Sequence, residues 1–203
     1  MSDATLHASG QTVHPTHQGL VQVHISAHAL DSVTLMSTWA SGIDGLTQAV
    51  HQALGCTPPA RTGETTGCAL GLLMRSGPLD FMLIGAQMAP DRVAQLRAHI
   101  PADTGSVLDL SHARVRVRVQ GVKAVDALSK LYALDFRPAA LAVGDFKLTG
   151  HHHIPCTLHR LDAHSFDLYF LSTYAHGQIA ALADTALEYG VSVDGHGRAD
   201  QIY

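Results

Sequence analysis

Fifteen histidines make imidazole the most frequent potential ligand or base in this chain of 203 residues. Three of them, His151, His152 and His153, are consecutive. On a strand the first and third would point to the same side of the sheet, and two imidazoles at that spacing could chelate a transition metal. His159 follows on the next predicted strand with the parity of His153, and His164 comes at the turn after it. No carboxylate or cysteine joins the group at ligand spacing, so we favour a polar hairpin and assign no metal ligand.

An acid, a hydroxyl, an imidazole and a guanidinium lie together in the segment 109–114, whose sequence is DLSHAR. The members of a catalytic triad meet in space and usually lie far apart in the sequence. The chain has no G-x-S-x-G segment, and it has no glycine-rich loop of the kinds that hold phosphate groups. We therefore assign no catalytic residue and no cofactor-binding residue. We interpret 109–114 as a corner between strands, fixed by hydrogen bonds from side chains to the backbone.

Three arginines alternate with three valines in the segment RVRVRV. On a strand the valines would face the core, and the arginines would form a row on the other face at intervals of about 7 Å. Arg114, Arg116 and Arg118 would repel one another unless carboxylates oppose them. Two interpretations stay open. The row binds an acidic partner or an anionic ligand, or it forms ion pairs within the sheet, for example with Asp162 or Asp167.

The elements that must position these residues follow from the spacing of apolar side chains. Strands are predicted over 20–25, 69–74, 81–84, 107–110, 115–119, 146–150, 154–160 and 165–171. Helices are predicted over 43–54 (ending at Gly55), 90–100, 122–131 and 179–187, with Ser172 or Thr173 as a cap of the last one. Neighbouring strands are often joined by tight links, which predicts an α+β fold with mostly antiparallel sheets and packed helices.

The polarity of the chain ends suggests the domain organisation. The stretch 1–19 is rich in Gly, Ser, Thr and His, and we predict a flexible N-terminal arm there. Residues 20–193 are expected to form a single domain with two α+β halves, about 20–105 and 106–193. Residues 194–203 are expected to be a frayed tail.

Composition restricts the class of protein. Charged residues make up 15% of the chain, against about 25% in an ordinary soluble domain. So little charge is typical of a subunit that covers part of its surface with a partner, although an alanine-rich composition would also lower it. The net charge of −4 argues against a nucleic-acid partner, and no apolar run has the length of a membrane helix. The three cysteines form no C-x-x-C and no signal peptide is visible, so we expect a cytoplasmic location.

The segment from Ser106 to about Gly190 resembles the gamma subunit of heterotetrameric sarcosine oxidase. The resemblance is carried by VLDLSHAR (107–114), VQGVKAVDALSK (119–130), LDF (134–136), VG (143–144) and SFDLYF (165–170). DLSHAR followed by G-x-x-A-x-x-x-L-x-K is the most specific part. Residues 20–105 match only in their general layout. The segment 171–175 reads LSTYA, where the family often has Arg-Ser-Phe-Ala.

The resemblance implies a fold like the folate-binding fold of the glycine cleavage T protein. It also implies a complex with alpha, beta and delta subunits. FAD, FMN, NAD, tetrahydrofolate and zinc would be held by those partners, and none of them by this chain. The expected function is that of a non-catalytic gamma subunit, which braces the large subunit. The complex would oxidise sarcosine to glycine through its flavin and pass the one-carbon unit to tetrahydrofolate.

Three alternatives remain. The chain could be a gamma-like subunit of a complex that acts on another N-methyl amino acid. It could be a stand-alone folate-binding or aminomethyltransferase-like protein, which would need an acidic residue over the pterin ring, and no such residue can be assigned. It could also be a metal-binding protein that uses the histidine hairpin.

Overall fold

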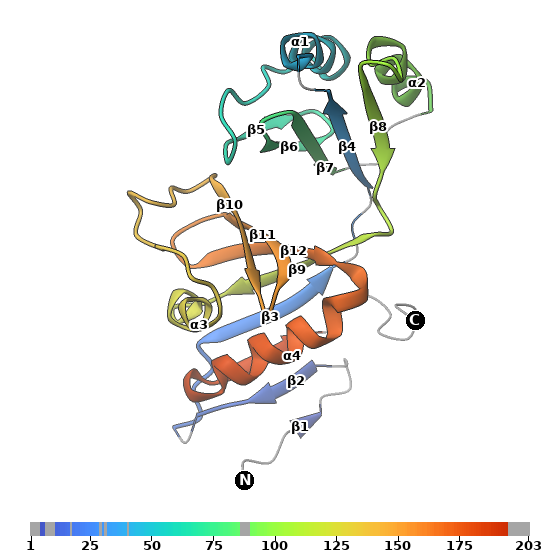
Figure 1. The fold of residues 1–203 in the computed structure, drawn as a ribbon. Coiled ribbons are helices and arrows are strands. Elements are labelled where there is room, and N and C mark those ends of the chain that lie inside the picture. Colours follow the sequence, from blue (N-terminus) through green and yellow to red (C-terminus); the bar gives the residue numbers. More distant parts are fainter. Residues whose placement is uncertain are drawn as a thin grey trace. The chain divides into compact units, whose positions relative to one another are not determined.

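The computed structural model of the chain describes residues 5–6, 11–16, 18–28, 30, 32–39, 41–85 and 90–194. These residues belong to two compact units (Figure 1). The first, called the split unit below, is made of Met1–Ala29 and Ala113–Tyr203, and the second, the inserted unit, is Leu30–His112. The units differ from the two halves expected from the sequence, because the first predicted strand pairs with a strand that follows the inserted unit.

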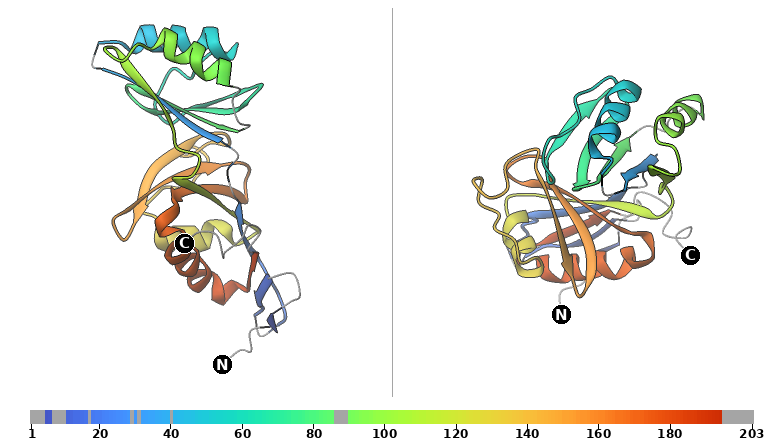
Figure 2. Two further views of the ribbon diagram at one scale, coloured as in Figure 1. Left: turned by 90° about the vertical axis from the view of Figure 1, so that its right-hand side faces the viewer. Right: turned by 45° about the horizontal axis from the view of Figure 1, so that its top comes forward.

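The described strands of the split unit form one sheet. Their order in the sheet is β1 (Thr5–Leu6), β2 (Gln11–His14), β13 (Val191–Asp194), β3 (Val23–His28), β9 (Arg114–Gln120), β12 (Ser165–Leu171), β11 (Ile154–Arg160) and β10 (Phe146–His151). Neighbouring strands are antiparallel, except that β13 and β3 run parallel. The helices α3 (Ala124–Leu131) and α4 (Ala175–Ala186) pack on one face (Figure 2), and the short 3-10 helices η1 (Ser172–Tyr174) and η2 (Leu187–Tyr189) flank α4.

The core of the split unit lies between this sheet and its helices. Val115, Val117 and Val119 of β9 are buried there, together with Leu128 of α3 and Leu182 of α4. Burial of these apolar side chains is the main favourable term in folding. Because successive side chains of a strand point to opposite faces, the arginines of β9 must face away from the helices.

A buried arginine fixes the connector between α3 and β10. Arg160 of β11 is 5% exposed, and its Nη1 donates to the carbonyl oxygens of Phe136 and Leu141, both at 2.9 Å. Its Nε donates to the carbonyl oxygen of Asp162 at 3.0 Å. A guanidinium can be buried when its donors are satisfied in this way. The connector therefore follows a defined path although it forms only turns.

The inserted unit is a second antiparallel sheet covered by two helices. Its described elements are β4 (Ser32–Thr38), α1 (Ile43–Leu54), β5 (Thr65–Cys68), β6 (Gly71–Gly77), β7 (Asp80–Gly85), α2 (Pro90–His99) and β8 (Gly105–Asp109), and the strand order is β5-β6-β7-β4-β8. Val50 of α1 and Leu96 of α2 pack with Met36, Leu73 and Phe81 of the sheet. None of the helices in the described part of the chain is long and apolar enough to cross a membrane.

The fold is α+β with mainly antiparallel sheets, as predicted. Helix α1 spans the predicted residues and ends at Gly55, whose φ of 66° allows the left-handed C-cap. Residues 11–14, which the sequence analysis places in a flexible arm, form β2 and pair with β13. Neither Ser172 nor Thr173 caps α4 with its side chain, because both lie in η1 and α4 begins at Ala175. Residues 1–4, 7–10 and 195–203 lie outside the described residues.

The histidine triplet forms a tight hairpin turn. His151 ends β10 and pairs with Ile154, so that His152 and His153 are the two loop residues between β10 and β11. Their φ angles are 49° and 65°, and positive values at both positions are typical of a type I′ turn. His151 and His153 therefore do not share a strand face, which removes the geometry that the chelation hypothesis needs. The ring of His151 lies 4.0 Å from that of His152 and 6.2 Å from that of Tyr132.

We predict that replacing this turn with the residues that its backbone favours will stabilise the protein. The double variant His152→Asn, His153→Gly should raise the free energy of unfolding by about 1 kcal/mol, because the left-handed backbone conformation strains most side chains other than Asn and Gly. His153→Val is the matched control and should lower the free energy of unfolding, since a β-branched residue fits this conformation poorly. Urea unfolding measures both. Equal stabilities of the three proteins would show that the turn is not strained.

Candidate functional site

The arginine row of β9 (Arg114, Arg116 and Arg118) is the candidate site that the sequence predicts. β9 lies between β3 and β12 in the sheet, and Arg118 is directly opposite Asp167 of β12. Its Nε and Nη2 donate to the two carboxylate oxygens at 2.8 and 2.9 Å. The side chain of Asp167 is only 3% exposed and that of Arg118 is 34% exposed. The ion pair raises the pKa of Arg118, and the internal-pairing interpretation is correct at this position.

The other two arginines stand opposite residues without a carboxylate. Arg116 is opposite Tyr169 and Arg114 is opposite Leu171. Among the described residues, no carboxylate forms a salt bridge with either of them. In each guanidinium the Nε atom is buried and has no hydrogen-bond partner there. Burial lowers the pKa of Arg114. The row therefore carries two positive charges that the described part of this chain does not neutralise.

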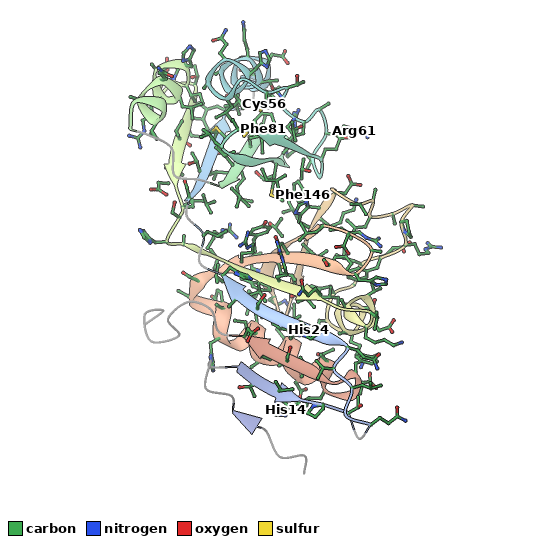
Figure 3. The ribbon with its side chains drawn as sticks, turned by 180° about the vertical axis from the view of Figure 1, so that it is seen from behind. His14, His24, Cys56, Arg61, Phe81 and Phe146 are labelled. Carbon is green, nitrogen blue, oxygen red and sulfur yellow. The ribbon has the colours of Figure 1, made fainter. Side chains whose placement is uncertain are left out.

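Serine and histidine side chains extend the polar face onto β3 and β13. Ser26 and His28 are opposite Arg118 and Arg116, and Ser26 Oγ lies 2.8 Å from His28 Nε2. Between β3 and β13, His24 Nδ1 lies 2.6 Å from Ser192 Oγ (His24 is labelled in Figure 3). A serine beside a histidine is the arrangement of a nucleophile and its base. Ser192, however, is only 4% exposed, so its hydroxyl cannot reach a substrate and the pair is structural.

The sequence alone does not predict these serine–histidine pairs. The one signal in the sequence is the alternation of Val23 and Ile25 with His24 and Ser26, which places the polar residues on one side of a strand. The pairing with Ser192 depends on the parallel contact between β3 and β13, which are separated by most of the chain.

The segment 109–114 is a corner, as its composition suggests. The backbone N–H and the hydroxyl of Ser111 both donate to Asp109 Oδ1, at 2.9 and 2.5 Å. The Ser111 hydroxyl oxygen accepts from the backbone N–H of Val33 at 3.0 Å, and Leu110 N–H donates to the Val33 carbonyl oxygen at 2.7 Å. The hydrogen bonds from Ser111 lower the pKa of Asp109. The serine is thus used to close β8 against β4.

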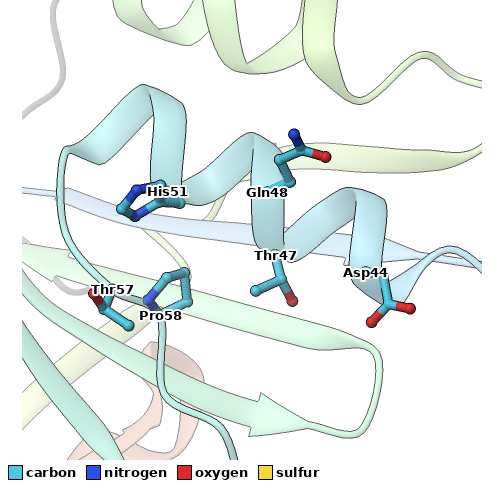
Figure 4. Close-up of a pocket in the computed structure, with 6 residues that line it drawn as sticks. All are labelled: Asp44, Thr47, Gln48, His51, Thr57 and Pro58. Atoms are coloured by element: carbon cyan, nitrogen blue, oxygen red, sulfur yellow. The ribbon is translucent and has the colours of Figure 1, made fainter.

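Two surface pockets lie elsewhere, one in each unit. The pocket of the inserted unit is about 380 Å³ in volume and is lined by Asp44, Thr47, Gln48, His51, Thr57 and Pro58. Figure 4 shows Asp44 and His51 at opposite ends of this row, so they do not converge on one point. The pocket of the split unit, about 370 Å³, lies between α4, β2 and β13 and is lined mainly by apolar side chains such as Ile179, Leu187 and Val193. Within the described residues, no group of three or more His, Cys, Asp or Glu side chains could hold a metal ion.

A buried histidine lies next to the ion pair of Arg118. His159 of β11 is opposite Asp167 and is 5% exposed. Burial lowers its pKa, although Asp167 and the backbone of Gly144 act in the opposite direction. Arg118 adds to the decrease and Asp145 opposes it. The folded state therefore favours the neutral ring.

We predict that His159 makes stability depend on pH. Because its pKa is lowered in the folded state, the unfolded chain binds more protons as the pH falls through the ordinary histidine pKa of about 6.5. The free energy of unfolding should then fall towards acid, with a slope of up to about 1.4 kcal/mol per pH unit. His159→Gln should reduce this slope in urea unfolding at pH values from about 5 to about 7. The control His164→Gln, at an exposed position, should keep it. An unchanged slope in His159→Gln would contradict the prediction.

The chain is similar to known proteins both in sequence and in structure. No family model matches the chain. The gamma subunit of sarcosine oxidase from Corynebacterium sp. (strain U-96) is 27% identical over 145 residues, which cover 71% of this chain and 70% of that protein. A chain of the heterotetrameric sarcosine oxidase from Corynebacterium sp. U-96, solved with pyrrole 2-carboxylate, has a TM-score of 0.72 at 24% identity and covers 82% of this chain and 85% of its own.

The second structural likeness is to aminomethyltransferase T of the glycine cleavage system from Bartonella henselae. The TM-score is 0.62 at 15% identity, over 96% of this chain and 56% of that chain. This likeness shows a shared fold, and it agrees with the folate-binding-type fold that the resemblance implies. The predicted resemblance to the gamma subunit of sarcosine oxidase is thus confirmed in sequence and in fold.

Proposed function

We propose that this chain is a gamma-type, non-catalytic subunit of a sarcosine oxidase-type complex. The observation that carries the proposal is the similarity to a sarcosine oxidase gamma subunit along most of the length of both proteins. The fold likeness, which covers 85% of a chain of a heterotetrameric sarcosine oxidase, supports it. The partners would be alpha, beta and delta subunits, assembled in the cytoplasm.

The chemistry of such a complex would take place in the partners. Their flavins, FAD and FMN, would oxidise the N-methyl group of sarcosine or of a related amino acid, and tetrahydrofolate would accept the one-carbon unit. NAD and zinc would also be held by the partners. This chain would bind and stabilise the larger subunits. Its low content of charged residues, 15%, suits a protein that covers much of its surface with partners.

Within this role, Arg114 and Arg116 are the residues that we assign to partner binding. Each has a buried Nε donor without a partner among the described residues. Both side chains are nevertheless partly exposed. A carboxylate from another subunit, or an anionic ligand, would pair with the exposed part of these guanidiniums through charge-assisted hydrogen bonds. We do not assign Arg118 this role, because its guanidinium is already paired with the Asp167 carboxylate.

The proposal predicts different behaviour for the isolated chain and for the complex. Expressed alone, the chain should be colourless and should not oxidise sarcosine. Expressed together with its alpha, beta and delta partners, it should purify with them at fixed stoichiometry, and the complex should oxidise sarcosine or another N-methyl amino acid. Flavin absorbance and amine oxidation measure the outcome. Flavin-dependent oxidation by the purified chain alone would contradict the proposal.

The assigned arginines can be separated from the paired arginine by mutation. Arg114→Gln, Arg116→Gln should keep the melting temperature, because these charges lack ion pairs, and should weaken binding to the partners about tenfold or more. Arg118→Gln is the matched control. This change leaves the buried carboxylate of Asp167 without its ion-pair partner. It should lower the free energy of unfolding of the free chain by about 2 kcal/mol. Partner binding by titration calorimetry and thermal melts distinguish the two. Full binding by the double variant, with a lowered melting temperature, would show that its arginines act within the chain.

The isolated chain and the assembled complex also test the alternative that the chain is a stand-alone folate-binding protein. This alternative is favoured by the fold shared with aminomethyltransferase T. Stoichiometric binding of tetrahydrofolate to the isolated chain would support it, and binding only by the assembled complex would support the subunit role.

A further inference from the structure

Two of the three cysteines, which lie twelve positions apart in the sequence, meet in the inserted unit. Cys56 follows the C-cap of α1, and Cys68 is the last residue of β5. The side chains of Cys56 and Cys68 lie close enough to interact, and both pack against the same apolar cluster. Both are free and partly exposed. The spacing in the sequence gives no sign of this contact, because it depends on how the loop 57–64 returns to the sheet.

The backbone at each thiol is held in place independently of the other. His51 Nδ1 lies 2.8 Å from the carbonyl oxygen of Cys56, and Gly55 N–H donates to the His51 carbonyl oxygen at 2.9 Å. Cys68 pairs with Gly71 in the β5–β6 ladder. Two cysteines can be bridged only when their backbones already lie close together. Here hydrogen bonds fix the backbone at both cysteines, and the two side chains interact across the loop that joins them.

The loop that joins the two cysteines is also fixed. Arg75 of β6 donates from Nη1 to the carbonyl oxygen of Ala60 at 2.8 Å and from Nη2 to that of Pro78 at 3.0 Å, and its guanidinium lies over the ring of Phe81. Glu64 pairs with the exposed Arg61 (Figure 3 labels Cys56, Arg61 and Phe81). The loop therefore keeps the two thiols together in the reduced protein.

We propose that Cys56 and Cys68 form a reversible disulfide when the protein meets a peroxide. The Cys68 thiolate attacks one peroxide oxygen, the O–O bond breaks and one water leaves, which gives a sulfenic acid on Cys68. The Cys56 sulfur then attacks the Cys68 sulfur, the S–S bond forms and a second water leaves with the Cys56 proton. Two thiols are oxidised and one peroxide is reduced to two waters.

The order of the two steps follows from the environment of Cys56. Burial and the neighbouring Cys68 raise the pKa of Cys56, so it is seldom a thiolate and acts as the resolving thiol. The third cysteine, Cys156, is a built-in control. It is 2% exposed and its pKa is raised to about 12 by burial, so it should not react. A disulfide of this type, reversible in a reducing compartment, would be a redox-sensing one.

Trypsin separates the two cysteines, which makes the bridge directly measurable. The first Lys or Arg of the chain is Arg61 and the next is Arg75. The full chain is treated with hydrogen peroxide, denatured, alkylated with iodoacetamide, digested and analysed by mass spectrometry without reduction. The peptide 1–61 should be joined to 62–75, Cys156 should be alkylated, and dithiothreitol should release both peptides. The oxidised chain should also unfold at a higher temperature than the reduced chain, because the bridge restricts the unfolded state.

Three variants make the outcome decisive. Cys156→Ser should form the same linked peptides, whereas Cys56→Ser and Cys68→Ser should form none. The inference is overturned if Cys56 and Cys68 are both recovered alkylated after peroxide treatment. It is also overturned if bridges to Cys156 or between two chains form in equal yield, or if the bridge lowers the unfolding temperature.

Discussion

The ion pair between Arg118 and Asp167 is the interaction on which the polar side of the split unit depends. It joins the neighbouring strands β9 and β12, with Asp167 almost fully buried and its two oxygens bonded to one guanidinium. A slip of the register by one residue would bury the arginines and expose the valines. Asp167 is the one carboxylate of β12 that lies opposite the arginine row, and Arg118 takes it. Arg114 and Arg116 are left without a counter-charge among the described residues, and this asymmetry is the basis of the assignment to partner binding.

The path of the chain explains why the split unit is built from both ends of the sequence. β3 lies before the inserted unit, and it pairs with β9 and β13, which lie after it. The inserted unit has its own sheet, its own pair of helices and its own apolar cluster. Contacts between distant segments are costly to form because long loops must close first. The pairing of β3 with β9 therefore closes a long loop, which contains the whole inserted unit.

Local patterns predict much of this structure, and long-range pairing accounts for what they miss. The helix over 43–54, the hairpin of β6 and β7 and the strands β9 to β12 follow from apolar spacing and glycine positions. The strand β4 is buried on both faces over Ser32–Thr34, so it has no alternation to detect. β2 and β13 have only four residues each, and they are strands because they pair with each other and because β13 also pairs with β3. For the site, the row of arginines is predictable, but its ion-pair partner, the serine–histidine pairs and the contact of Cys56 with Cys68 depend on tertiary structure.

The proposed function makes this chain a subunit of a larger flavin-dependent complex. The most direct measurement is affinity purification of the tagged full-length chain from its native cell, with native mass spectrometry of the product. The account predicts one complex of fixed stoichiometry that contains larger flavoprotein subunits and oxidises an N-methyl amino acid. A monodisperse chain that is recovered without any such subunit, from cells that express the complex, would contradict it.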